Sequence, residues 1–285
     1  MSEVLFVDKN SLEKIPSALK NIGLKKFAKE KVLVKLHMGE INNKWYVKPE
    51  IAKIAVDELK KIKSDPFLFD TPSIYRGSRD SKEKYMDVAK KHGFDRIGCE
   101  VVIGNEGKYV KAEGGGITFN FEIPDKMLKT KNMLVLSHVK GHELTGIGGA
   151  IKNLGMGGVS KATKGAMHTA SVVRSIPFLS KRKITFARIL ALGAGTVLKD
   201  KNAFYMSVLL NITKYCDCCN TSLPIISKDV GFLFSTDPVA IDAASVDLIK
   251  KNAVLEKIFE RDPFEHLNFA EDIGLGTTEY KLVKM

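Results

Sequence analysis

Three side chains that could take part in catalysis or metal binding share one glycine-rich stretch of this 285-residue sequence. They are His142, Lys152 and His168, and seven of the eighteen residues from 141 to 158 are glycine. Ordering glycine costs extra backbone entropy, so such a density indicates a backbone that turns tightly or approaches a ligand closely. Lys152 lies between glycine turns, where its amine could anchor or contact a cofactor. A solvated surface lysine is the competing interpretation.

The glycines themselves are the second part of this candidate site. The runs Gly146-Ile-Gly-Gly and Gly155-Met-Gly-Gly match neither the P-loop nor the dinucleotide-binding pattern. We therefore expect the stretch to lie against a metal or metallo-cofactor rather than a nucleotide phosphate chain. The glycines expected to contact that cofactor are Gly148, Gly149, Gly155 and Gly157.

Histidine and cysteine supply the candidate metal ligands. Neutral imidazole is a common ligand of nickel, iron and zinc, which makes His142 and His168 candidates. A second donor set, Cys216-Asp-Cys218-Cys219, places three thiols in four positions. It lacks the paired CxxC spacing of zinc ribbons and ferredoxins, so we expect Cys216 and Cys218 to need a further ligand. Structural histidines and buried small thiols remain the alternative interpretation.

Reactive residue types also follow three apolar runs that look like strands. His37 ends the run 32–38, Asp70 and Thr71 follow 66–70, and His138 ends 133–138. Ligands bind beyond the carboxyl ends of strands in open α/β sheets, so these residues are expected to share one site. We assign His37 and His142 as candidate acid–base residues because imidazole titrates near neutral pH. Asp70 and Thr71 are candidate cofactor contacts.

The elements that must position these residues alternate between strand and helix. Helical spacing covers 49–62 and 82–92 between the strand-like runs, which favours a parallel sheet flanked by helices. Strands are expected at 99–103 and 117–122, with a turn-rich segment from 104 to 116. In the second half we expect a helix over 184–199 and a strand within 225–235, whereas 202–213 is ambiguous. Asp237 and Pro238 begin a further helix.

The second half of the chain adds two carboxylates to the candidate site, and the chain contains no long linker between separate domains. Asp229 and Asp242 are interpreted as acceptors that orient the histidine or thiolate site. The fold class is α/β, with mostly parallel sheets flanked by helices. We expect two intercalated α/β lobes, about 1–130 and 131–285, with a site between them.

Composition limits the classes of function. The hydrophobic content is 44%, the net charge is +12 and the pI is about 9.3. No apolar run is long enough to span a membrane and the N-terminus lacks a signal peptide, so we expect a cytoplasmic protein. The lysines are scattered among acidic residues and no aromatic–basic platform occurs, which disfavours nucleic acid as a partner. A small anionic molecule fits the charge better.

The motifs together resemble the DUF362 family of uncharacterised proteins, often described as iron–sulfur proteins. The matching pieces span nearly the whole chain: Val34-Lys-Leu-His-Met-Gly-Glu40, Asp70-Thr with Tyr75 and Arg79, Lys140-Gly-His, Gly148 to Gly158, Lys164 with Met167-His168, Cys216-Asp-Cys218, and Ser235 to Asp242. Many members carry a cysteine-rich ferredoxin-like insertion soon after the position of His168. This chain lacks that insertion.

A more distant similarity concerns the nickel-pincer lactate racemase family. Its pattern of histidine, a glycine-rich lysine segment and histidine resembles His142, Lys152 and His168, which are ten and sixteen residues apart. The resemblance implies that Lys152 carries a tethered nickel-pincer-like cofactor, that His168 binds the metal, and that His142 is an acid–base residue. The family's N-terminal substrate-arginine motif has no clear copy here.

Two main hypotheses of function follow. The first is a metal-dependent or metallo-cofactor enzyme that acts on a small anionic substrate, by a racemase-like or redox reaction. The second is a non-catalytic metal or iron–sulfur protein for electron transfer, which would use Cys216, Cys218 and Cys219 and a redox partner. The sequence leaves the oligomeric state open.

Overall fold

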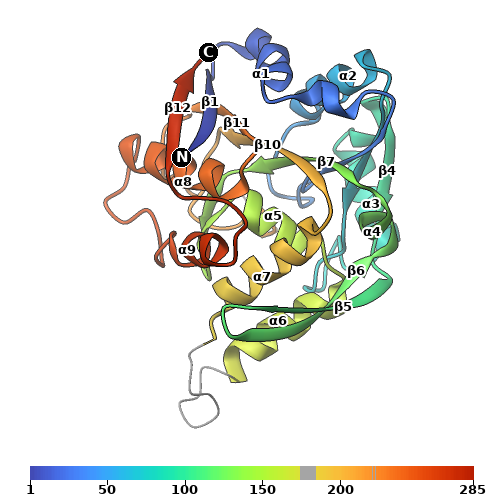
Figure 1. Ribbon diagram of the computed structural model, residues 1–285, viewed down its shortest axis with the longest axis vertical. Coiled ribbons are helices and arrows are strands. Elements are labelled where there is room, and N and C mark those ends of the chain that lie inside the picture. Colours follow the sequence, from blue (N-terminus) through green and yellow to red (C-terminus); the bar gives the residue numbers. More distant parts are fainter. Residues whose placement is uncertain (174–183, 220, 222) are drawn as a thin grey trace.

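Nearly continuous apolar runs build the central strands of one large sheet (Figure 1), and both faces of these strands are buried. The computed structural model describes residues 1–173, 184–219, 221 and 223–285. Over these residues its strands are β1 Ser2–Asp8, β2 Lys31–Lys35, β3 Asp65–Asp70, β4 Glu100–Ile103, β5 Gly107–Gly114, β6 Ile117–Pro124, β7 Asn132–His138, β8 Lys140–His142, β9 Gly146–Gly148, β10 Asn202–Leu209, β11 Gly231–Ser235 and β12 Tyr280–Lys284. Its α-helices are α1 Ile15–Asn21, α2 Pro49–Lys61, α3 Lys82–Lys91, α4 Asp125–Lys129, α5 Ala150–Gly157, α6 Lys161–Val173, α7 Phe186–Leu198, α8 Pro238–Lys251 and α9 Glu265–Asp272.

The central sheet has eight strands in the order β12-β1-β11-β10-β7-β2-β3-β4. The five strands from β10 to β4 are parallel to one another, whereas β11 runs antiparallel to both β10 and β1. The carboxyl ends of β2, β3 and β7 therefore meet at one edge of the sheet. Strands from both sides of residue 130 pair in this sheet, and the proposed division into two lobes at that position stays a prediction.

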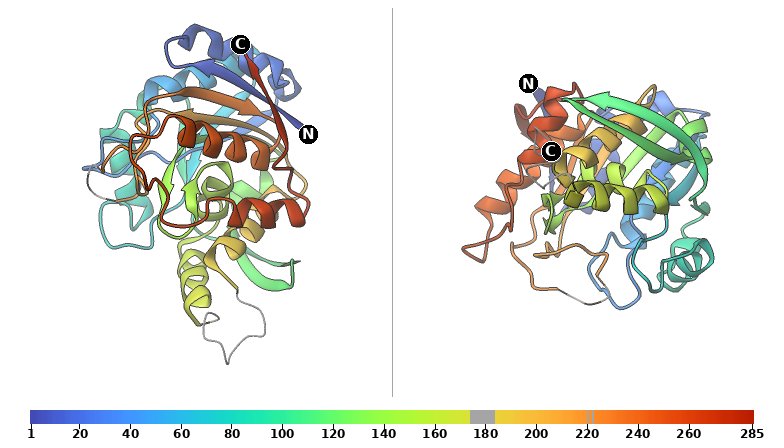
Figure 2. Two further views of the ribbon diagram at one scale, coloured as in Figure 1. Left: turned by 90° about the vertical axis from the view of Figure 1, so that its left-hand side faces the viewer. Right: turned by 90° about the horizontal axis from the view of Figure 1, so that it is seen from below.

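Side chains along β2 and β7 alternate between two hydrophobic cores. Val32 and Val34 of β2 pack with α1, α2 and α3, whereas Leu33 points to the core formed with α5, α7 and α8. In β7, Leu134 lies in the first core and Met133 in the second. A period of two in a strand places neighbours on opposite faces, so helices must cover both sides. Figure 2 shows these helical layers on either side of the sheet.

The expected α/β class is confirmed, and most of the expected elements lie where the sequence placed them. The side chain of Asp237 caps α8 by accepting from the backbone N–H groups of Val239 and Ala240, at 2.8 and 3.0 Å. The ambiguous segment 202–213 contains a strand, β10, at the centre of the sheet. The strand-like run 225–235 is a strand only from Gly231, where β11 begins.

One local prediction was wrong. The segment 104–116 is not a run of turns, because β5 pairs along its length with β6 in a hairpin. The glycines at 107, 114, 115 and 116 concealed this strand, whose side chains are mostly exposed or half-buried. The hairpin packs against α7 beside the second core.

None of the helices in the described part of the chain combines the length and the apolar character needed to cross a membrane.

Candidate functional site

A cavity of about 540 Å³ opens at the carboxyl ends of β2, β3 and β7. Residues that immediately follow these strands, including His37, Thr71 and Lys140, line it together with side chains of α5 and α6. The loop from Ser73 to Arg79 and the segment Cys216–Cys219 complete its wall. The prediction that three strand ends form one shared site agrees with this arrangement.

The floor of the cavity is a buried ion pair between two neighbouring strands. Lys35 of β2 lies 2.9 Å from the Asp70 carboxylate of β3, and its Nζ also donates to Asn153 Oδ1 at 2.7 Å. Burial lowers the pKa of Lys35 and raises that of Asp70, but the charge of Lys35 and the hydrogen bond with His37 prevail and hold the pKa of Asp70 well below its usual range. Asn153 also donates to the Leu136 carbonyl at 3.0 Å, which ties α5 to β7.

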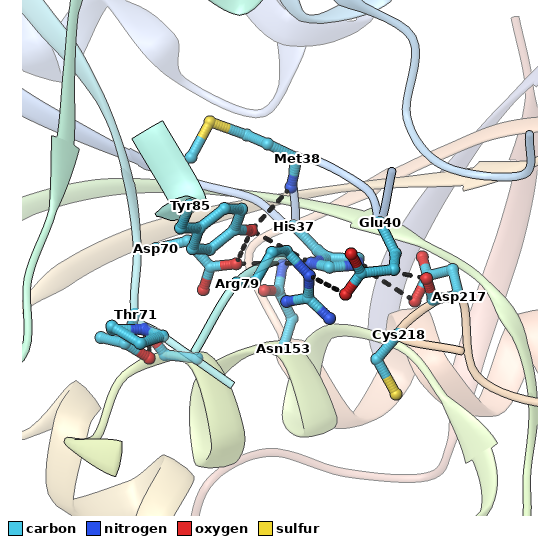
Figure 3. A network of polar contacts seen from close by, with 12 residues as sticks. His37, Met38, Glu40, Asp70, Thr71, Arg79, Tyr85, Asn153, Asp217 and Cys218 are labelled. Atoms are coloured by element: carbon cyan, nitrogen blue, oxygen red, sulfur yellow. Dashed lines mark hydrogen bonds and ion pairs between the residues drawn. The ribbon is translucent and has the colours of Figure 1, made fainter. Parts of the chain in front are cut away.

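His37 is held by a tyrosine and two aspartates (Figure 3). Its Nδ1 lies 3.2 Å from the Tyr85 hydroxyl and 3.4 Å from the Asp70 carboxylate, and Tyr85 donates its own hydrogen to Asp70. Both neighbours of Nδ1 therefore accept, so Nδ1 carries the proton of the neutral ring. Nε2, the basic nitrogen, lies 3.4 Å from the Asp217 carbonyl and 3.7 Å from the Asp217 carboxylate, so a proton taken up there would be held by Asp217. Burial lowers the pKa of His37, although Asp217 opposes this shift. The ring is neutral and basic at neutral pH.

His142 has the complementary arrangement. Its Nδ1 accepts from the Leu144 backbone N–H at 3.2 Å, so Nε2 carries the proton of the neutral ring. Burial lowers the pKa of His142, and a hydrogen bond with Cys216 opposes that shift. The same cavity therefore holds one histidine that can accept a proton at Nε2 and one that can donate a hydrogen bond from Nε2.

Two further carboxylates are neutralised by buried cations. Arg79 Nε donates to Glu40 at 2.8 Å, and Lys140 Nζ lies 3.0 Å from the Asp217 carboxylate. Asp217 also contacts His138 Nδ1 at 3.1 Å. Burial raises the pKa of Asp217, but Lys140 and the two histidines lower it well below its usual range. Each of the three buried carboxylates, Glu40, Asp70 and Asp217, thus has its own cation.

Two lysines that line the cavity have no carboxylate within ion-pair distance among the described residues. Lys152 Nζ donates to Cys216 Sγ at 2.8 Å, and Lys164 Nζ donates to the backbone carbonyls of Thr71 and Pro72 at 3.2 and 2.7 Å. Burial lowers the pKa of Lys152, but the charges of Cys216 and Cys218 outweigh it and raise the pKa. Burial lowers the pKa of Lys164 to about 7. The cavity therefore carries an excess of positive charge.

The three thiols of the segment 216–219 lie at this cavity and are unoxidised. The Cys218 backbone N–H donates to Cys216 Sγ at 3.4 Å, which folds the segment around that sulfur. A hydrogen bond with Cys218, followed by burial, raises the pKa of Cys216, and the charge of Lys152 opposes this shift.

The glycine-rich stretch owes much of its composition to close packing. The amino end of α5 is capped by the Asp242 carboxylate, which accepts from the backbone N–H groups of Ala150 and Ile151 at 2.7 and 2.9 Å. A Cβ at Gly149 would lie 2.2 Å from Asp242, and one at Gly155 would lie 2.3 Å from the Leu190 carbonyl of α7. Gly157 leaves room for Lys35 in the same way. The helix end that could have bound an anion already holds a carboxylate of the chain.

Most of the predicted site residues lie on the cavity. They are His37, Asp70, Thr71, His142, Lys152, Gly157, His168, Cys216 and Cys218. Gly148, Gly149 and Gly155 lie outside its lining over the described residues. Asp242 caps α5 and Asp229 accepts from the Asn211 backbone N–H at 2.6 Å, so neither orients a histidine or a thiol.

The candidate site residues did not include the charged framework of the cavity, namely Lys35, Glu40, Arg79, Tyr85, Lys140, Asn153, Lys164 and Asp217. A signal was present for Lys35, since a lysine inside the apolar run Val32–Met38 must be paired to be buried. Tyr85 and Asn153 gave no such signal, because each fits an ordinary helix.

A metal would need more protein ligands than the described residues bring together. Among these residues, no group of three or more histidine, cysteine, aspartate or glutamate side chains is placed to hold an ion. A lysine-tethered cofactor would need fewer protein ligands, because the cofactor supplies metal ligands of its own. The Lys152 amine, a neighbouring thiol and the half-buried His168 ring, which packs on Phe186 at 4.5 Å between centroids, line one cavity and fit such a group.

Comparison with known proteins gives a family and a fold. The pattern of DUF362, a domain of unknown function, matches residues 32–247. No curated protein matches the sequence. The structure resembles the lactate racemase apoprotein from Thermoanaerobacterium thermosaccharolyticum, with a TM-score of 0.53 and 13% identity. The match covers 88% of this chain and 57% of that one.

A second similar structure is a crystal structure of a Thermotoga maritima protein, with a TM-score of 0.51 and 12% identity over 86% of this chain and 60% of the other. The chain therefore spans about three fifths of the length of these two structures. At such low identity the likeness concerns the fold, which is α/β in each case.

Proposed function

This chain belongs to the DUF362 family, and on that basis we propose that it is an enzyme that acts on a small anionic substrate in the cavity at the ends of β2, β3 and β7. One observation carries the proposal. The three buried carboxylates of the cavity are each paired with a cation, and two lysines, the half-buried Lys152 and the buried Lys164, remain at the cavity without a carboxylate partner among the described residues. Unpaired buried charge is costly, and an anionic ligand would remove that cost.

Acid–base chemistry by two histidines is the second part of the proposal. Neutral His37 can take a proton on Nε2, and neutral His142 can donate a hydrogen bond from its Nε2 to an oxygen of the substrate. Such a pair can remove the hydroxyl proton of a 2-hydroxy acid and return it, as a racemase-like or redox reaction at the adjacent carbon requires. The fold likeness to a lactate racemase apoprotein supports this class of substrate.

Lys152 and His168 would hold the cofactor of this reaction. A nickel-pincer-like group tethered to the Lys152 amine would supply a reversible hydride acceptor when bound. The chain's own contribution is a half-buried amine at 2.8 Å from the Cys216 sulfur, together with the imidazole of His168 on the same cavity. Nickel is the metal we propose first, with iron or zinc as alternatives.

Turnover of enantiopure 2-hydroxy acids tests this function. Native-purified protein is incubated with a panel of these acids, and chiral chromatography follows the loss of optical purity. We expect racemisation of at least one acid. The rate should fall by a factor of at least about 10² in His37→Asn, because that variant lacks the general base. Lys25→Met, a change outside the cavity lining, should keep the full rate. Optical purity retained throughout the panel would contradict the proposal.

The second candidate function is metal or cluster binding for electron transfer, and the convergence of Cys216, Cys218 and Cys219 on one cavity favours it. It predicts a thiolate-to-metal absorption band that Cys216→Ser abolishes and Lys152→Ala leaves unchanged. The proposed enzyme predicts the reverse sensitivity, since its cofactor depends on Lys152.

A further inference from the structure

Arg79 is a buried guanidinium with one end left unsatisfied. The residue is 4% exposed, its Nε donates to Glu40 at 2.8 Å, and its Cζ lies 5.1 Å from the centre of the Tyr85 ring. Figure 3 shows the guanidinium between these two neighbours. Within the described residues, Nη2 is buried and has no hydrogen-bond partner. A native structure rarely leaves such a group unpaired, so an unsatisfied donor at a cavity points to a ligand.

Glu40 determines which edge of the guanidinium remains available. Because the carboxylate takes Nε, the outer pair of nitrogens is the edge that a ligand can use. The buried Glu40 side chain and the Tyr85 ring fix the plane of the guanidinium. A fixed planar fork of N–H donors matches the oxygens of a carboxylate or a phosphate.

Lys164 adds a second cation to the same cavity. Its ammonium group, buried on α6, spends two of its three hydrogens on the Thr71 and Pro72 carbonyls and keeps one. Burial is the main cause that lowers the pKa of Lys164; Asp70 raises this pKa, and the charges of Lys35 and Arg79 lower it further. The two cations are thus near enough to repel each other, and no carboxylate among the described residues pairs with Lys164.

We propose that Arg79 and Lys164 form the oxyanion subsite of this cavity and bind the carboxylate or phosphate group of the substrate. The inference rests on the proposed function in one respect, namely that the cavity takes a small anion. It adds the residues that hold the charged end of that anion. The Lys152, His142 and Cys216 side chains are then left for the reacting end.

Titration of the full chain with two probes tests the subsite. The probes are L-lactate and inorganic phosphate, each added at low ionic strength and pH 6.5, with binding followed by calorimetry. Lys164→Met removes an ammonium that has no carboxylate partner, and Arg79→Lys keeps a charge beside Glu40 but removes the planar fork. Lys161→Met is the matched control, because Lys161 lies on the same helix, donates to the Asp80 carbonyl and lies outside the cavity lining.

We expect the wild-type chain to bind one of the two probes, with affinity at least about 10-fold lower in Lys164→Met and in Arg79→Lys, and unchanged in Lys161→Met. Binding of lactate alone assigns a carboxylate, and binding of phosphate alone assigns a phosphate. Failure of both probes to bind, or binding that neither variant weakens, overturns the subsite.

The test of the oxyanion subsite can fail independently of the test of the proposed reaction. Racemisation with an unchanged KM in Lys164→Met and Arg79→Lys would overturn the subsite and leave the enzyme proposal standing. Binding that depends on both residues, in a chain that racemises none of the 2-hydroxy acids, would support the subsite and contradict the reaction.

Discussion

The protonation and hydrogen bonding of the cavity residues depend on their neighbours more than on the residue type. His37 and His142 are both half-buried neutral imidazoles, yet hydrogen bonds at Nδ1 make Nε2 an acceptor in His37 and a donor in His142. Lys152 and Lys164 both line the cavity, yet Cys216 and Cys218 raise the pKa of Lys152 and burial lowers that of Lys164 to about 7. Only the folded chain makes these distinctions.

The pKa of Lys164 gives a pH dependence with a definite sign. Asp70 raises this pKa, whereas Lys35, Arg79 and Lys152 lower it together with burial. The ammonium is present below about pH 7 and lost above it, so the affinity for an oxyanion should fall as the pH rises from 6 to 8. Lactate is the suitable probe, since its own charge is constant over this range, and calorimetric titration at several pH values measures the effect. An equally steep fall in Lys164→Met would rule out this residue as the origin.

At the level of elements, α5 shows what the glycine-rich sequence is for. Gly155 allows the backbones of α5 and α7 to approach closely. A Cβ at this position would lie 2.3 Å from the Leu190 carbonyl and 2.9 Å from the Leu190 side chain. This contact fixes the helix that carries Lys152 and Asn153 over the ends of β2 and β7. Packing of the site helix, rather than a loop around a phosphate, accounts for this glycine.

Two glycine substitutions on neighbouring helices should therefore have opposite effects. Gly155→Ala forces α5 away from α7 and should lower the free energy of unfolding by about 1–3 kcal/mol, as overpacking does. Gly165→Ala on α6 meets nothing within 4 Å and should raise it by about 0.5–1 kcal/mol, because alanine favours a helix. Urea denaturation of both variants measures the difference. Equal stability of the two would refute the packing account of Gly155.

The sequence predicted the elements better than the contacts between them. Alternating apolar runs at 32–38, 66–70 and 133–138 were sufficient to place β2, β3 and β7 and to bring His37, Asp70 and His138 to one edge. The sequence did not predict the β5–β6 hairpin, because glycines interrupt the strand-like pattern of β5. The pairings of Arg79 with Glu40 and of Lys140 with Asp217 join residues 39 and 77 positions apart, and spacing along the chain carries no signal for them.

At the scale of the whole molecule, the sheet joins distant parts of the chain into one cooperative unit. The strand β1 pairs with both β11 and β12, so the first strand lies beside two of the last strands (Figures 1 and 2). Polar groups buried by this assembly then affect the stability of the entire chain. His266 of α9, fully buried, is an example.

Protonation of His266 should destabilise the folded protein in acid. Burial lowers the pKa of His266 from 6.5 to about 4. The unfolded chain therefore binds the proton more readily, and about 3 kcal/mol of stability is lost as the pH falls from 6.5 to 4. The difference in unfolding free energy between wild type and His266→Gln, measured in urea at several pH values, isolates this contribution. A difference that stays constant from pH 7 to pH 4 would show that His266 does not titrate as described.

The central claim is that the cavity at the carboxyl ends of β2, β3 and β7 is a catalytic site whose Lys152 carries a metallo-cofactor. The most direct test is the intact mass of native-purified protein, combined with peptide mapping and elemental analysis. The account predicts a mass excess on the peptide that contains Lys152, accompanied by bound metal, and loss of both in Lys152→Ala. An unmodified Lys152 in protein that binds metal through Cys216 would contradict it.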